Sequence, residues 1–363
     1  MPRGIYLQFD KSVEEIQPDE DKIIDKIIAS GDRLGKAALE RNGRALRAAH
    51  AKNHGILKGT LTVCENLPDH LRQGLFATPR SYPIIVRFST GFGDLRSDRI
   101  PNPRGMAIKV LGVDGDRLCP DDTSANQDIL LVNHSTYFSD IATYERFAGM
   151  VADVPKKSNF NLSLTAAVAS FFNKLLNGFR PKIFLRMLFS TVADTGRHIL
   201  GETYHSQAAL RFGDYIAKLS AAPTGETKKL AGAPVGSGDD SLGQLVSNFL
   251  KTNAAEYELR AQLCTDLKHM PVEDAWAEWP EKLSLPQVVA RITLPAGQDP
   301  LSPARCEHGD RLSFTPWRGL SAHQPLGSIM RLRKKAYEAS SAFRHRENKQ
   351  PFEEPRAISD FPD

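Results

Sequence analysis

The spacing of hydrophobic positions divides the chain into helical ends and a middle rich in short apolar segments. Near the N-terminus, isoleucines recur three and four residues apart between charged residues, which predicts helix over about residues 18–50. Three glycines interrupt this pattern, so two helices are an alternative to one. Helical spacing returns in four further segments: residues 141–152, 161–190, 241–251 and 328–346.

The middle of the chain carries the signals of β-strands. Six short segments are apolar and β-branched with turn residues between them, and residues 201–213 form a weaker seventh. Because these segments do not alternate regularly with helices, they predict an antiparallel barrel within an α+β fold. Residues 221–240 are rich in Gly, Ala and Pro and predict an exposed loop. The six predicted strands are residues 55–63, 82–89, 104–113, 127–133, 257–266 and 287–295.

Composition limits the classes of partner. Hydrophobic residues make up 41% of the 363 residues, which is enough for a large core. The 47 Lys and Arg against 43 Asp and Glu leave a net charge of +4, which is too small to favour nucleic acid. Charged residues stand where a signal peptide would need an apolar core, and they also interrupt the longest apolar stretch, residues 160–192. We therefore expect a soluble, cytoplasmic protein with no nucleic-acid partner and no stable membrane insertion.

Three residue patterns are candidates for chemistry, and each has a structural alternative. His50 and His54 have the spacing of metal ligands on a helix, but a glycine follows and no Glu stands beside either, so zinc is weakly supported. Asn133 ends a predicted strand, either as a turn residue or as an amide that orients a ligand. Arg333 and Tyr337 are four residues apart on a predicted helix, where a guanidinium favours a phenolate. The alternative for that helix is a solvated basic surface.

Taken together, five strings in the sequence resemble the haem catalases in order and at similar spacing. A sixth string, GETYHSQAALRFGDYIAKL, is similar to a short catalase-related subfamily that includes peroxidases and fatty-acid hydroperoxide isomerases. The five strings are ALRAAHAKNHG (45–55), IIVRFSTGFGD (84–94), PNPRGMAIKV (101–110), DILLVN (128–133) and LGSIMRLRKKAYEASSAFRHREN (326–348).

The resemblance implies a set of site residues around haem b. His50 matches the distal histidine of catalases, within an R-x-x-H-A-K string, and Asn133 matches the distal asparagine. Tyr337 matches the axial ligand of the haem iron, with Arg333 as its companion. Phe147 falls at the spacing of a phenylalanine that packs near the distal face of the haem.

The resemblance also implies arginines that bind the haem propionates. Arg47 and Arg87 match two of them. Arg87 lies in a predicted strand that buries one face, and a buried arginine needs an anionic partner, which a propionate supplies. A third propionate arginine follows the tyrosine in catalases, and either Arg344 or Arg346 can fill that place.

The fold that the resemblance implies is a single catalase-like domain over residues 1–363, with an antiparallel β-barrel core enclosing haem. An N-terminal helical arm (1–50) precedes the barrel (55–300), which carries a helical insertion (141–190), and a proximal helix (326–348) bears the tyrosine. The implied function is haem-dependent decomposition of hydrogen peroxide or organic hydroperoxides, as a catalase or as a peroxidase with an organic electron donor. By analogy, a homo-oligomer is expected.

Two alternatives stay open. Ala49 stands where catalases have valine and the allene oxide synthase relatives have threonine, and its small side chain favours larger hydroperoxides. A fatty-acid hydroperoxide isomerase or lyase is therefore the first alternative. A non-catalytic haem carrier or sensor is the second, although a carrier does not need the pair of His50 and Asn133. Residues 159–193, apolar and basic, are packing helices, a lid over an apolar channel, or a surface that docks on an anionic membrane.

Overall fold

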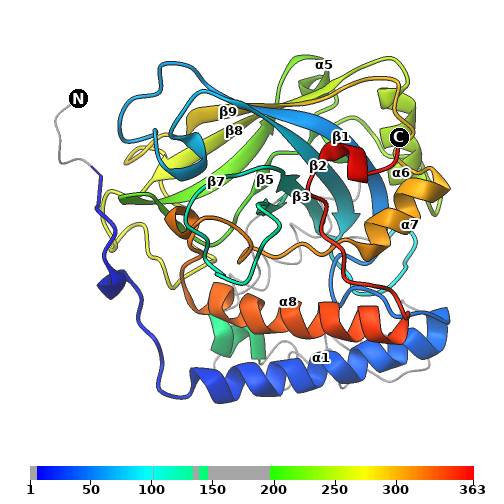
Figure 1. Cartoon of the computed structure of the whole chain (residues 1–363), viewed down its shortest axis with the longest axis horizontal. Coiled ribbons are helices and arrows are strands. Elements are labelled where there is room, and N and C mark those ends of the chain that lie inside the picture. Colours follow the sequence, from blue (N-terminus) through cyan, green and yellow to red (C-terminus); the bar gives the residue numbers. More distant parts are fainter. Residues whose placement is uncertain (1–5, 101, 134–138, 146–196) are drawn as a thin grey trace.

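In the computed structural model, residues 6–100, 102–133, 139–145 and 197–363 are described. Within them the strands form one antiparallel sheet in the order β5-β4-β3-β2-β1-β9-β8-β7-β6, and β5 also pairs with β7. This second pairing closes a barrel, and β6 extends β7 as a hairpin (Figure 1). The strands are β1 (Asn53–Val63), β2 (Ser81–Thr90), β3 (Arg104–Val110), β4 (Gln127–Val132), β5 (Tyr204–His205), β6 (Leu210–Phe212), β7 (Tyr215–Pro223), β8 (Ala255–Leu263) and β9 (Gln287–Leu294).

Side-chain alternation along the strands separates the barrel interior from its outer face. In β2, Val86 and Phe88 point into the interior, where the Phe88 ring lies 6.0 Å from that of Tyr204 and 6.4 Å from that of Tyr257. Their neighbour Arg87 therefore points outward. The outer face of β2 is nevertheless buried, because other segments cover it.

Helices cover the outer face of the barrel. In Figure 1, α8 and α1 lie side by side beneath the barrel, and their interface buries Ile24 and Ile27 against Leu332. The α-helices are α1 (Glu20–Asn42), α5 (Gly225–Lys228), α6 (Ser241–Leu250), α7 (Pro303–Arg311) and α8 (Ser328–Glu347). Short 3-10 helices are η1 (Lys11–Val13), η2 (Gly74–Phe76), η4 (Ile199–Gly201), η5 (Ser321–His323) and η6 (Ile358–Asp360).

The predicted N-terminal helix is one helix and is shorter than expected. α1 continues through Gly31 and Gly35, and the ring of Phe343 lies against Gly35. The helix ends at Gly43, which takes the left-handed conformation (φ +67°) and donates its N–H to the carbonyl of Leu39. Residues 44–50 are therefore an irregular connection to the barrel and not helix.

Two other expectations are wrong. The predicted loop at residues 221–240 begins with the end of β7 and contains α5, and Thr227 within it is fully buried. The segment around Cys306 and His308 is helix α7, which Ser302 caps and Pro303 begins. The predicted seventh strand is two short strands, β5 and β6. In the described part of the chain, no helix is long and apolar enough to cross a membrane.

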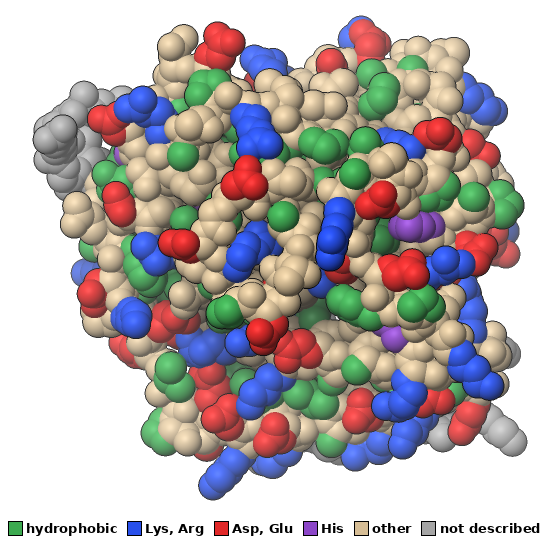
Figure 2. All heavy atoms as spheres, viewed as in Figure 1, with side chains coloured by type: hydrophobic (Ala, Val, Ile, Leu, Met, Phe, Trp, Pro, Cys, Tyr) green, Lys and Arg blue, Asp and Glu red, His purple; other side chains and the backbone are tan. Residues whose placement is uncertain are grey.

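The surface shown in Figure 2 mixes acidic and basic side chains without a patch of one sign. This distribution agrees with the near balance of charges in the sequence.

Candidate functional site

His50 lies in the connection after α1, against the outer face of the barrel. Its backbone has φ +56°, which is uncommon for a residue other than glycine. Its N–H donates to the carbonyl of Gly91 at 3.0 Å, and its Nδ1 lies 3.1 Å from Oγ of Ser89. The ring also rests on Gly105, where a Cβ would come within 2.6 Å of two ring atoms. Ser89 and Gly105 are paired across β2 and β3, so two adjacent strands hold one imidazole.

The environment of His50 keeps the imidazole neutral. Burial, the largest cause, and the positive charges of Arg87 and Arg333 together lower the pKa of His50 to about 3. A neutral imidazole can accept a proton, as a general base must. An anion bound beside these arginines would offset their charge and raise the pKa of His50.

Asn133 follows β4 and is buried next to the same edge of β3. Its Oδ1 accepts the backbone N–H of Arg104 at 3.0 Å, one residue before the glycine beneath His50. Its Nδ2 lies 3.4 Å from a carboxylate oxygen of Glu202, a long hydrogen bond. The structure thus brings Asn133 to the strand that supports His50, with its amide engaged by Arg104 and Glu202.

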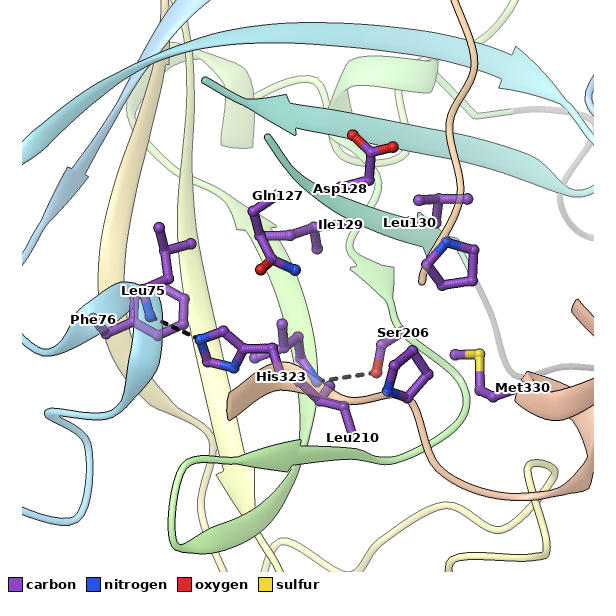
Figure 3. Close-up of a pocket in the computed structure, with 13 residues that line it drawn as sticks. Leu75, Phe76, Gln127, Asp128, Ile129, Leu130, Ser206, Leu210, His323 and Met330 are labelled. Carbon is purple, nitrogen blue, oxygen red and sulfur yellow. Dashed lines mark hydrogen bonds between the residues drawn. The ribbon is translucent and has the colours of Figure 1, made fainter. Parts of the chain in front are cut away.

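Helix α8 carries a coupled pair of residues. The guanidinium of Arg333 donates from Nη2 to the hydroxyl of Tyr337 at 2.9 Å, and its carbon lies 5.1 Å from the centre of the tyrosine ring. Its Nη1 lies 3.4 Å from the sulfur of Met330. Met330 is buried and lines a small cavity of about 40 Å³ at one end of the barrel (Figure 3).

The segment of His50 contacts α8 directly. The N–H of Ala48 donates to Oγ of Ser340 at 3.1 Å, one helical turn beyond Tyr337. Arg333, the partner of Tyr337, also acts electrostatically on His50. The predicted histidine and the predicted tyrosine are therefore brought together, from the two ends of the chain, between the barrel and α8.

A cluster of arginines lies beside this region. Arg47 and Arg344 both donate to the carbonyl of Leu312, at 2.8 and 3.1 Å. Arg87 donates to the carbonyl of Ala51 at 3.1 Å, and both other arginines act on its charge. Burial and the charge of Arg47 lower the pKa of Arg87, and the same two causes together bring the pKa of Arg344 to about 9.

The arginine cluster carries more positive charge than its acidic neighbours balance. Asp310 pairs with Arg47 at 3.5 Å and acts electrostatically on the other two guanidinium groups. The buried Nε atoms of Arg87 and Arg344 have no hydrogen-bond partner among the described residues. Buried donors of this kind require an acceptor. The arrangement suits a ligand with two carboxylates.

The two arginines left open by the sequence differ in their surroundings. Arg344 is buried in the cluster, whereas Arg346 is exposed and pairs with Glu347. Phe147 lies outside the described residues.

Some residues of the site were not predicted. Ser89 stands two residues after Arg87, so strand alternation places both on the outer face of β2. The sequence pattern could therefore have placed Ser89 beside the site. For Gly105 and Met330, no pattern in the sequence indicates a place beside the site. Tyr144 lies near Tyr337. Burial raises the pKa of Tyr144, and Tyr337 raises it to a smaller extent.

The metal-pair interpretation of the histidines is wrong. His54 is not on a helix with His50; it lies buried in β1, with Nε2 3.2 Å from Oγ1 of Thr90. Among the described residues, no group of His, Cys, Asp and Glu could hold a metal ion.

Comparison with known proteins shows the fold. No family model matches the chain, and no curated protein is similar to it in sequence. A fungal catalase superimposes with a TM-score of 0.62 and 18% identity, over 85% of this chain and 61% of that one. Catalase A from Saccharomyces cerevisiae has the same TM-score and 17% identity, over 96% of this chain and 70% of that one. The chain has the catalase fold. It spans less than two thirds of the length of the fungal catalase.

Proposed function

We propose that this protein is a haem-dependent enzyme that decomposes peroxides, as a catalase or peroxidase. One observation carries the proposal: within a catalase fold, the buried Arg87 and Arg344 and the partly buried Arg47 form a cluster suited to a dicarboxylate, beside His50 and the pair of Arg333 and Tyr337. Haem is a ligand of this kind, because it has two carboxylates, which arginines can bind, and a metal centre, which a tyrosine can bind.

The residues fit the group. Arg47, Arg87 and Arg344 would hold the propionates, and the unpaired Nε atoms of the last two are ready donors. Tyr337 would bind the iron through its oxygen, as a tyrosinate does in catalase-type haem. When bound, the haem iron supplies the two-electron reduction of the peroxide O–O bond.

His50 would move the proton. As a neutral base it takes the proton from one peroxide oxygen and returns it to the leaving oxygen, so that water or an alcohol departs. The hydrogen bond to Ser89 and the support from Gly105 fix the ring for this transfer. Asn133 would orient the peroxide through Nδ2, whose present bond to Glu202 is long enough to exchange.

On α8, Arg333 would hold the oxygen of Tyr337 in place. The guanidinium donates to the phenol oxygen at 2.9 Å and brings a positive charge beside it. Bound to the iron as a tyrosinate, Tyr337 would support the oxidised states of iron that peroxide reduction requires.

The first test is oxygen release from hydrogen peroxide by the haem-loaded protein and its variant His50→Ala. We expect the variant to bind haem and to lose about 10²–10⁴-fold in turnover, the usual contribution of a proton-transferring side chain. The control is His269→Ala, because His269 is exposed and pairs with Asp266 in a loop. Haem binding without turnover in the wild-type protein would contradict the proposal and favour a carrier or sensor.

A second candidate is a fatty-acid hydroperoxide isomerase or lyase. Ala49, beside His50, is exposed and small, which leaves room for a bulky peroxide. Product analysis with a lipid hydroperoxide separates the two functions. Epoxide or aldehyde products formed without an added electron donor would favour the isomerase, and an alcohol formed only with a donor would favour the peroxidase.

A further inference from the structure

A cavity of about 460 Å³ opens at the surface beside the arginine cluster. Its walls come from four parts of the chain that are distant in the sequence: residues 44–53 on either side of His50, the loop after β2, the residues before α6, and α7 with the residues just before it. None of the roles proposed above uses this cavity.

The floor of the cavity shares residues with the arginine cluster. Ala51 lines the cavity and accepts the hydrogen bond of Arg87 through its carbonyl at 3.1 Å. Asp310 lines it as well and pairs with Arg47 at 3.5 Å. A molecule in the cavity would therefore contact residues that themselves contact Arg87 and Arg47, two of the arginines that would hold the propionates.

The charges that line the cavity balance one another. Arg44 pairs with Asp310, and Lys52 lies 2.9 Å from a carboxylate oxygen of Asp240. Three basic and three acidic side chains line the cavity, so their formal charges cancel, and a charged ligand would compete with the pairs of Arg44 and Lys52. The cavity thus favours a neutral ligand.

The remaining lining is suited to an aromatic alcohol. Leu95 is 44% exposed and lines the cavity with Leu301, which offers an apolar surface for a ring. Nδ2 of Asn53 points to the sulfur of Cys306 at 3.7 Å, and because sulfur is a weak acceptor the amide can donate to a ligand hydroxyl instead.

We propose that this cavity binds the organic electron donor of the peroxide reaction, a neutral phenol. This inference rests on the proposed function. In the reaction, two phenol molecules each lose one electron and one proton. The peroxide ROOH gains these two electrons and two protons, its O–O bond breaks, and ROH and water form. A donor bound here would lie beside the arginines that would hold the propionates, whereas peroxide would react on the side of His50.

The experiment uses the haem-loaded full chain and 2-methoxyphenol as the probe. Binding is measured from the relaxation of the probe's protons in nuclear magnetic resonance, which the ferric iron accelerates. We compare Leu95→Asp, which places a charge on the apolar wall, with Leu285→Asp. Leu285 is 65% exposed and does not line the cavity, so it is a matched control.

For Leu95→Asp we expect about tenfold weaker probe binding and about a tenfold higher KM for the probe. Oxygen release from hydrogen peroxide should match that of Leu285→Asp. Equal probe binding by the two variants would overturn the inference. A higher KM for linoleic acid hydroperoxide instead of the phenol would overturn it too, since the cavity would then serve the peroxide. A wild-type protein that takes up no haem would defeat the proposed function itself, whereas turnover without any relaxation effect would defeat the cavity alone.

Discussion

At the scale of single residues, the main feature of the site is the way in which neighbouring groups hold the imidazole of His50. The left-handed backbone of His50 costs about 1–3 kcal/mol, and such a conformation persists only where neighbouring groups fix it. Here the carbonyl of Gly91 and the hydroxyl of Ser89 fix both the backbone and the ring. A histidine that only filled space would not need this strain, so the geometry agrees with the proton transfer proposed for it.

The close contact beneath the ring leads to a prediction for Gly105→Ala. The new Cβ would lie 2.6 Å from Nδ1 and Cε1 of His50 and 3.0 Å from Oγ of Ser89, so the imidazole must shift. A displacement of about 1 Å can cost about 10²-fold in rate, and we expect a loss of that order in oxygen release. Haem titration should give an unchanged affinity, because the arginines and Tyr337 are not touched.

The control for this variant is Gly31→Ala, since no atom lies within 4 Å of the added Cβ. Wild-type turnover by Gly105→Ala would mean that the position of His50 does not govern the reaction.

At the scale of elements, α8 was predicted well and its surroundings were not. The sequence predicts residues 328–346, and the helix spans Ser328–Glu347. The alternative of a solvated basic face is wrong for Arg331, which pairs with Glu14, Glu20 and Glu273. Two of these partners lie more than 300 residues away, and helical spacing alone does not reveal such contacts.

One contact of α8 gives a prediction for Met330→Leu. Leucine keeps the volume, so the cost in stability should stay below about 1.5 kcal/mol. The variant removes the sulfur that accepts from Arg333, and a hydrogen bond of about 1 kcal/mol corresponds to about fivefold weaker haem binding. We also expect the midpoint potential of the bound haem to shift, because Arg333 would hold the oxygen of Tyr337 less firmly.

Met106→Leu is the matched control, because Met106 is buried in the barrel core. If both variants keep the wild-type potential and haem affinity, Met330 only packs and does not position Arg333.

At the scale of the whole molecule, the sequence predicts the barrel but not how it closes. The strands 55–63, 82–89 and 287–295 correspond to β1, β2 and β9 within a few residues. β7 was missed because it ends in alanines, which have low strand propensity, and burial in the barrel overrides that preference. Closure depends on β5, a strand of two residues within the weak signal at 201–213, which the sequence did not separate from β6. The roles of His50, Asn133 and Tyr337 came from the resemblance to catalases, not from strand or helix patterns.

The C-terminal segment joins the barrel through buried charges. Lys109 on β3 is fully buried and lies 2.8 Å from Asp128 and 2.7 Å from Glu354. Arg318 lies 2.9 Å from Asp128 and 3.1 Å from Glu354. Two cations and two anions thus balance one another, and Glu354 ties residues after α8 to the outer face of the barrel.

Glu354→Gln should therefore destabilise the whole fold. The change leaves two buried cations with one carboxylate, and removing one partner from a buried pair costs about 3–5 kcal/mol. We expect the lower part of this range, since the amide oxygen of glutamine still accepts one hydrogen bond. Urea unfolding measures the loss, and Glu353→Gln is the control because Glu353 is the exposed neighbour. Equal midpoints for the two variants would mean that the tail is held by its apolar contacts, such as Phe361 against Ile56 and Ile85, and not by the charges.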